Sequence, residues 1–214
     1  MRILILGGTS EARALAALIG ADARFDGLLS LAGRTATPAP LPIQVRSGGF
    51  GGADGLARFL IDGGFEAVID ATHPFAINIS ANAVAAAQAT GLALGTLLRK
   101  PWTEEPGDRW IKVPDARCAA DALGAAPHRV FLTVGRLELG AFAAAPQHSY
   151  IARTIDPPQD VALPPNFTLI QARPPFDIEA EQRFLGDQCI DVLVSKNSGG
   201  ADTYAKIAAA RALH

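Results

Sequence analysis

Short apolar runs alternate along this chain with longer stretches in which the apolar residues recur at helical spacing. The first run, at 2–6, ends at a pair of glycines, and an Ala- and Leu-rich stretch then continues to Ile19. Strands that are apolar along their whole length are typical of parallel sheets covered by helices on both faces. The pattern therefore predicts an α/β protein whose parallel sheets are flanked by helices.

The alternation forms two series. The first predicts strands at 2–6, 25–32, 43–46, 67–70 and 92–98. It predicts one helix that ends near Ile19 and further helices at 53–62 and 72–90. The second predicts strands at 109–113, 130–134, 150–153, 167–171 and 190–194, with helices at 114–123, 137–144, 177–185 and 200–213.

Residues 99–108 interrupt the alternation, because prolines, acidic residues and Trp102 are crowded into this stretch. We therefore expect a Rossmann-like lobe at 1–98, a connector at 99–112 and a second α/β lobe at 113–214. Folds of this kind bind ligands beyond the carboxyl ends of their strands. We therefore expect a ligand cleft between the two lobes.

Composition narrows the class of protein. The chain has 214 residues, of which 49% are hydrophobic, and a net charge of -2, which argues against a nucleic-acid binder. No apolar run approaches the ~18 residues of a membrane span, and no signal peptide precedes the first strand. Cys118, Cys189 and the histidines lack metal-ligand spacing. We expect a cytoplasmic protein without a metal, a membrane anchor or a nucleic-acid partner.

The turn after the first strand suits a phosphate. Gly7 and Gly8 allow a sharp turn and close approach of a ligand, and the amides at a helix start attract anions. Thr9 or Ser10 fits the helix cap, and Glu11 in the first turn suits the helix dipole. Glu11 also stands where the dinucleotide fingerprint has its third glycine. The alternative is a purely structural glycine turn.

The end of the second strand favours NADP over NAD. The acidic residue that would bind the ribose of NAD, ~20 residues past the glycines, is missing. Ser30 and Arg34 are instead suited to a 2′-phosphate. The alternative for Arg34 is a solvated cation on a loop.

His73 follows the fourth strand in the peptide DATHPFA and is expected at a helix start. It is a candidate donor of a hydrogen bond or a proton, and the alternative is a capping or packing histidine. Asp70 is more simply a structural acid at a strand end. Asn78 and Ser80, on the expected helix, have weaker claims.

Two clusters in the second half also follow strands. They are the peptide Thr133–Arg136 and the peptide Ser195–Gly200, each with small residues and a cation before a helix. Arg99, Lys100 and Arg153 add positive charge near the same expected edge. Cations gathered at strand ends of an acidic chain indicate a polyanionic ligand.

Taken in order, these peptides resemble the precorrin-6A reductase family. The matching stretches are ILGGTSEAR, SLAGRT, SGGFGG, DATHPFA, TVGRLEL and VSKNSGGADTYAKIAAAR. The resemblance implies an NADPH-dependent reductase that saturates one double bond of the precorrin-6A macrocycle and gives precorrin-6B. It also implies two Rossmann-like lobes with the tetrapyrrole between them, and a further strand after the last helix, which this chain lacks.

The resemblance assigns roles to the clusters. NADPH is expected at Gly7, Gly8, Thr9, Ser10, Glu11, Ser30 and Arg34. Precorrin-6A is expected at His73, Arg136, Ser195, Lys196, Asn197 and Ser198, with His73 as the protein's candidate proton donor. Contact with neighbouring pathway enzymes is a further expectation. The alternatives are a non-catalytic NADP-sensing module and a methyltransferase acting on an acidic tetrapyrrole.

Overall fold

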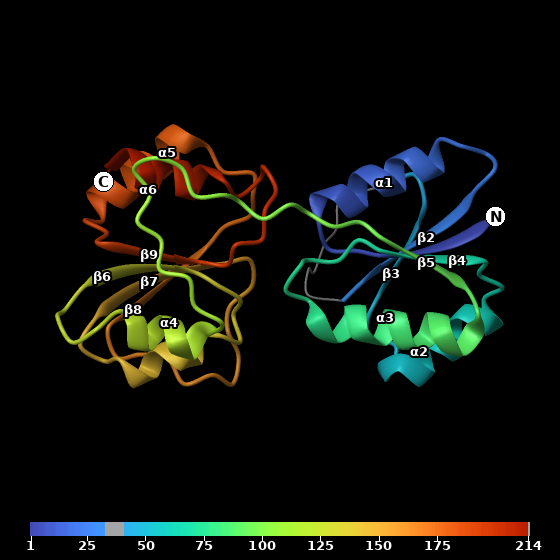
Figure 1. The fold of residues 1–214 in the computed structure, drawn as a ribbon, viewed down its shortest axis with the longest axis horizontal. Helices are drawn as coiled ribbons and strands as arrows, with labels where there is room; N and C mark the ends of the chain where they lie inside the picture. Colours follow the sequence, from blue (N-terminus) through green and yellow to red (C-terminus); the bar gives the residue numbers. More distant parts are fainter. Residues whose placement is uncertain (33–40, 214) are drawn as a thin grey trace. The chain divides into compact units, whose positions relative to one another are not determined.

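The protein consists of two compact α/β units, Met1–Arg99 and Lys100–His214, in a computed structural model that describes residues 1–32 and 41–213. Each unit is a parallel sheet with helices on both faces (Figure 1). This confirms the predicted fold class. Within the described parts of the chain, every helix is too short or too polar to cross a membrane.

The first unit holds a five-stranded sheet in the order β3-β2-β1-β4-β5. Its strands are β1 (Arg2–Leu6), β2 (Asp26–Leu31), β3 (Gln44–Ser47), β4 (Ala67–Asp70) and β5 (Ala93–Thr96), and its helices are α1 (Ser10–Gly20), α2 (Gly52–Asp62) and α3 (Ile77–Thr90). Leu6 at the end of β1 pairs with Ser30 on one side and Asp70 on the other. The residues after β1 therefore emerge between the ends of β2 and β4.

Both faces of this sheet are buried along its central strands β2, β1 and β4, which explains their continuous apolar runs. Ile3 and Ile5 of β1 pack against α1, where Ala16 lies in the contact. Leu4 and its alternate neighbours face the other way and pack against Leu56 of α2 and against α3 (Figure 1). Burial of each such large side chain contributes about 1.5–3 kcal/mol, so β1 is the most firmly held strand of the unit.

The second unit repeats this winding with four strands, in the order β8-β7-β6-β9. Its strands are β6 (Arg129–Thr133), β7 (Ser149–Thr154), β8 (Phe167–Gln171) and β9 (Val192–Ser195), and its helices are α4 (Ala116–Ala122), the 3₁₀ helix η1 (Leu139–Ala144), α5 (Ile178–Asp187) and α6 (Ala205–Leu213). Helices α4 and η1 cover one face, and α5 and α6 cover the other (Figure 1).

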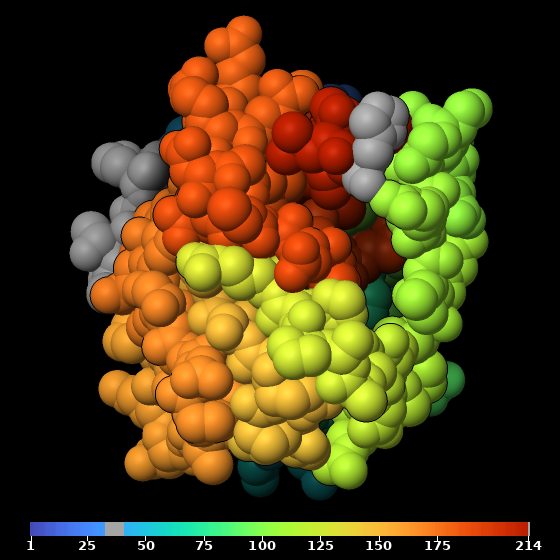
Figure 2. All heavy atoms as spheres, turned by 90° about the vertical axis from the view of Figure 1, so that its left-hand side faces the viewer, coloured from blue at the N-terminus to red at the C-terminus, as the bar shows by residue number. Residues whose placement is uncertain are grey.

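The strand expected at 109–113 is not formed, and this prediction is wrong. The segment that begins at Lys100 instead lies along the second unit beside α6, as Figure 2 shows in green. The Arg211 guanidinium of α6 donates to Asp108 at 2.8 Å and to Glu105 at 2.8 Å. Side-chain contacts rather than a strand ladder therefore hold this segment.

Two helices begin later than predicted. The helix expected from Thr72 begins at Ile77, because the Asp70 carboxylate accepts the Thr72 N–H and the His73 ring accepts the Phe75 N–H. Those bonds hold the first residues in turns. The helix expected from 200 begins at 205, since the glycines at 199 and 200 have φ angles of 64° and 82°, outside the helical region.

Candidate active site

The predicted polar clusters lie near the point in each sheet where the order of successive strands reverses direction. Ligands of such sheets bind beyond the carboxyl ends of the strands at this switch point. In the first unit the switch lies between β1 and β4, so it carries the glycine turn and the peptide after Asp70. In the second it lies between β6 and β9, where Thr133 pairs with Ser195. Each unit therefore presents one candidate binding edge.

The turn after β1 is shaped by its two glycines and by the cap of α1. The Gly7 N–H donates to the Ser30 carbonyl at 2.9 Å. A methyl group on Gly7 would lie 2.5 Å from Leu29 Cδ1, whereas Gly8 needs its glycine for a φ of +126°. The hydroxyl of Thr9 accepts the Ala12 N–H at 3.0 Å and thereby caps α1. Two glycines and one cap thus leave an open helix N-terminus that suits a phosphate.

The Thr9 hydroxyl also connects this turn to the next loop. It donates to the carbonyl of Ala71 at 2.8 Å, in the first residue after β4. Thr9 is buried, so this bond is shielded from water. The two loops that flank the switch point are consequently held together by one side chain.

Ser10 and Glu11 are held by Arg99. The Arg99 guanidinium donates to the Glu11 carboxylate through Nε at 2.6 Å and through Nη2, and it reaches the Ser10 hydroxyl at 3.1 Å. Burial opposes ionisation of Glu11, but these hydrogen bonds outweigh it and lower the pKa of the carboxyl. The ion pair holds a guanidinium beside the N-terminus of α1. From the sequence alone, Arg99 is expected only as one more cation near the carboxyl ends of the strands.

At the end of β2, Ser30 is bound by an arginine that the sequence did not single out. Ser30 is buried, and its hydroxyl accepts from Arg46 Nη1 at 2.8 Å. The guanidinium of Arg46 lies 4.1 Å from the centre of the Phe50 ring, and it donates to the Gly48 carbonyl at 3.1 Å. The parallel register that pairs Ser30 with Arg46 would have identified it. Arg34, the predicted phosphate ligand, lies outside the described residues.

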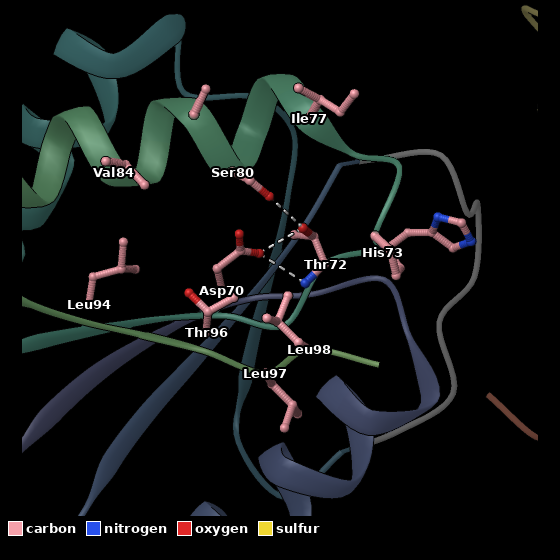
Figure 3. A pocket seen from close by; sticks show the side chains of 12 residues that line it. Asp70, Thr72, His73, Ile77, Ser80, Val84, Leu94, Thr96, Leu97 and Leu98 are labelled. Carbon is pink, nitrogen blue, oxygen red and sulfur yellow. Dashed lines mark hydrogen bonds between the residues drawn. The ribbon is translucent and has the colours of Figure 1, made fainter. Parts of the chain in front are cut away.

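A cavity of about 430 Å³ opens beyond β4 and β5, beside α3 (Figure 3). Its polar floor is Asp70, whose Oδ1 accepts from the Thr72 N–H at 3.0 Å and from the Thr72 hydroxyl at 2.7 Å. The hydroxyls of Thr72 and Ser80 are 3.4 Å apart. Val84 and Leu94 are among the apolar walls.

His73 lies at the edge of this cavity, and its ring points away from Asp70 (Figure 3). Its Nδ1 accepts the Phe75 N–H at 3.2 Å, so the neutral ring carries its proton on Nε2. That geometry suits a donor of a hydrogen bond or a proton. His73 lies four positions before the start of α3 at Ile77, and not in its first turn as predicted, because of this same turn.

In the second unit the predicted substrate residues are largely engaged with their own loops. The Lys196 ammonium pairs with Glu138 at 2.7 Å, and the same carboxylate accepts the Gly135 N–H at 2.8 Å. The structure therefore brings together the two turns that flank this switch point. Arg136 is half-buried in the first of them.

The remaining members of the last cluster fix the loop. The Asn197 amide bonds the backbone of Trp102 in both directions, at 2.7 Å and 2.9 Å. The Ser195 hydroxyl donates to the carbonyl of Lys196 at 3.2 Å, and Ser198 is buried. Asn197 thus secures the segment after Lys100 to the second unit.

Arg153 is not part of the exposed charge at this edge, contrary to the sequence expectation. Its guanidinium pairs with Glu181 at 2.7 Å, and the two side chains are only 9% and 4% exposed. The guanidinium also lies over the rings of Phe131, Phe176 and Phe184. β7 directs this residue under α5, which covers that face of the sheet.

Lys206 lies near this buried pair and is itself 6% exposed. Its ammonium donates to the Thr203 carbonyl at 2.9 Å. Burial is the main cause that lowers its pKa to about 8, partly offset by the attraction of Glu181. The buried group therefore contains two cations and one carboxylate.

Lys206 is expected to make stability depend on pH. Its folded pKa of about 8 lies below the ordinary 10.5, so the unfolded state binds more protons between these values and stability rises with pH in that window. Relative to a Lys206→Met variant, the wild type should gain roughly 2 kcal/mol from pH 8 to pH 10. Urea unfolding at successive pH values measures this difference in stability. Any contribution from titration of the Cys118 thiol cancels, because both proteins contain it. A constant difference would contradict the buried charge.

Three or more metal-ligating side chains do not converge anywhere within residues 1–32 and 41–213. The groups that the structure offers to a ligand are backbone amides, hydroxyls, guanidinium groups and one cavity carboxylate. These suit a phosphorylated organic cofactor.

Known proteins resemble this chain over its whole length. A family model described as "Precorrin-6x reductase CbiJ/CobK" matches residues 2–214. The chain is 53% identical to a "Precorrin-6A reductase" from Sinorhizobium sp over 212 residues, which cover 99% of this chain and 81% of the relative. It is 48% identical to a protein of that name from Rhodobacter capsulatus, over 99% of this chain and 84% of the relative. The solved structure "CobK precorrin-6A reductase" matches with a TM-score of 0.93 and 48% identity, covering 99% of this chain and 84% of that one.

Proposed function

Because this chain belongs to the precorrin-6x reductase CbiJ/CobK family, we propose that it reduces one double bond of the precorrin-6A macrocycle with NADPH and gives precorrin-6B. The observation that carries the proposal is identity of 53% along 99% of the chain to a reductase of that name. The parallel sheet with a glycine turn at its switch point supports it, since this edge suits a dinucleotide.

The first unit holds the cofactor in this proposal. The amides after Gly7 and Gly8 bind the pyrophosphate, and the Thr9 cap keeps the start of α1 in place. Arg99 adds positive charge beside them through its contact with Ser10 and Glu11. NADPH supplies the hydride when it is bound.

Ser30 and Arg34 bind the 2′-phosphate of the cofactor. Arg46 supports them, because its guanidinium already holds the Ser30 hydroxyl at 2.8 Å. An acidic residue at this edge would bind the ribose of NAD instead. The edge of β2 thereby favours the phosphorylated coenzyme.

The substrate is an acidic tetrapyrrole, and the second unit offers it cations and hydroxyls. Arg136 and Lys196 attract its carboxylates, and the peptide Ser195–Ser198, including Asn197, contributes amides and hydroxyls. Lys196 leaves its ion pair with Glu138 to do so. His73, with its proton on Nε2, protonates the carbon beside the one that receives the hydride.

We place the reaction in the cytoplasm, where NADPH is available and thiols stay reduced. Cys118 and Cys189 are free thiols in the described part of the chain, which fits that compartment. Neighbouring pathway enzymes would exchange substrate and product with this one by direct contact.

The direct test is to mix the protein with precorrin-6A and NADPH and to follow the absorbance of the reduced nicotinamide. Oxidation of NADPH that depends on both partners, faster than with NADH, is the expected result. Tight binding of NADPH without oxidation would instead indicate a sensing module. Transfer of a methyl group to the pigment without NADPH binding would indicate a methyltransferase.

His73→Ala is expected to slow protonation of the macrocycle by about 10²–10⁴-fold while NADPH affinity is unchanged, because a positioned acid contributes a factor of that size. Stopped-flow absorbance separates oxidation of the cofactor from the later change in the pigment. His128→Ala, in the second unit, is the matched control. An unchanged pigment phase in His73→Ala would remove His73 from the mechanism.

A further inference from the structure

The cavity beyond β4 and β5 combines apolar walls with one carboxylate. The apolar side chains that line it include Ile77, Val84, Leu94 and Leu98 (Figure 3). Asp70 is 5% exposed and directs its carboxylate into the space. A volume of about 430 Å³ is large enough for one heteroaromatic ring with its substituent and too small for a tetrapyrrole.

The floor of the cavity presents acceptors of hydrogen bonds. Two groups donate to the Asp70 carboxylate, the Thr72 N–H and the Thr72 hydroxyl, and both donate to its Oδ1. From the residues that the structure describes, Asp70 Oδ2 accepts no hydrogen bond. The Thr72 hydroxyl donates its hydrogen bond to Asp70, so its oxygen can only accept a further one. A carboxylate ligand would be repelled here, whereas a primary amide, with two N–H donors, is complementary.

The position of the cavity relative to the glycine turn matches a dinucleotide. In the order β2-β1-β4, the Ser30 edge lies on one side of the turn and Asp70 on the other. The bond from Thr9 to the Ala71 carbonyl holds the turn against the loop that forms the cavity floor. A cofactor with its 2′-phosphate at β2 and its pyrophosphate after β1 therefore reaches this cavity with its other end. This step rests on the proposed function.

We propose that Asp70 is a catalytic residue, which binds the carboxamide of the nicotinamide ring and stabilises the positive charge that the ring gains. When hydride leaves the dihydronicotinamide, its two electrons pass to the conjugated double bond of the substrate and the ring becomes a cationic pyridinium. A proton is added to the neighbouring carbon of the substrate, and Asp70 is unchanged at the end. A fixed anion in an apolar cavity favours the charged product and the transition state that leads to it.

Asp70→Asn tests the charge while it retains the size and the Oδ1 acceptor for the Thr72 N–H. The expected result is that the affinity for NADP⁺ falls at least ~10-fold, that for NADPH falls less than ~3-fold, and hydride transfer slows ~10–100-fold. Both affinities are measured by titration of the whole protein without substrate. Ser80→Ala, which alters the cavity wall but no charge, is the matched control and should leave the ratio of the two affinities unchanged.

Equal losses for NADP⁺ and NADPH in Asp70→Asn would show that Asp70 is structural and would overturn the inference, while the proposed function stands. Failure of the wild type to bind either coenzyme would overturn the proposed function itself. The wild type also tests the amide contact directly, with the 3-acetylpyridine analogue of NADP⁺, which lacks the N–H donors. The analogue should bind at least ~5-fold more weakly than NADP⁺, and equal binding would exclude the carboxamide contact even if the Asp70 variant does not fold.

Discussion

Arg153→Met is expected to lower the free energy of unfolding of the second unit by about 3–5 kcal/mol, because it leaves the Glu181 carboxylate buried without its ion-pair partner. The two side chains are 9% and 4% exposed, and Arg153 Nη1 lies 2.7 Å from Glu181 Oε1. In addition, Arg153 Nε and Glu181 Oε2 are buried without a hydrogen-bond partner among the described residues. The pair is therefore costly to bury and more costly to break.

Urea unfolding followed by tryptophan fluorescence measures this loss. The chain has two tryptophans, Trp102 and Trp110, and both belong to the second unit, so the signal reports that unit. Glu181→Met should be at least as damaging, since it leaves Arg153 and Lys206 without their shared carboxylate. The double variant, Arg153→Met with Glu181→Met, should regain most of the loss. A double variant as unstable as the sum of the two single ones would contradict a buried ion pair.

Gly8→Ala is expected to weaken NADPH binding by about 100-fold while the fold of the first unit remains. Gly8 has a φ of +126°, which a residue with a side chain adopts only at a cost of about 1–3 kcal/mol. A methyl group there would meet no described atom within 4 Å, so the backbone is free to relax. Relaxation turns the amides away from the position of the pyrophosphate, and the anion site is lost.

Gly64→Ala is the matched control for this variant. Gly64 also has a positive φ, of +62°, with no described atom within 4 Å of an added methyl group. Gly64 precedes β4 and therefore lies near the amino ends of the strands, whereas Gly8 lies at their carboxyl ends. The Gly64→Ala variant should lose stability but keep the wild-type affinity for NADPH, measured by fluorescence titration. If Gly8→Ala binds NADPH as tightly as the wild type, the turn is not the cofactor site.

Much of this architecture could be predicted because the strands are buried on both faces. The run at 2–6 coincides with β1, since an apolar run bounded by turn residues has few other ways to be buried. The run at 167–171 coincides with β8 as well, although this edge strand is only half-buried or exposed. The segment 109–113 shows the limit of that reasoning. It is apolar enough for a strand, but no described strand pairs with it, and the acids before it are drawn to Arg211 of α6.

The candidate site could be predicted in its position but only partly in its contacts. Polar peptides after Leu6 and Asp70 had to meet, because neighbouring parallel strands end at the same edge. The partner of Ser30 could not be read in the same way, since Arg46 reaches it through the register of β3 against β2.

The sequence by itself determined the α/β class, the two winding series and the strand ends at which the polar peptides stand. These properties depend on periodicity and on glycine, which act over a few neighbouring residues. Only the tertiary structure decided which charges are exposed, paired or buried. Arg99 meets Glu11 across 88 positions of the chain, and Arg153 lies under α5 with Glu181 rather than at the ligand edge. The reason is physical: the pairing of a charge depends on which distant residues the packed layers bring within a few ångströms, and no local pattern records that.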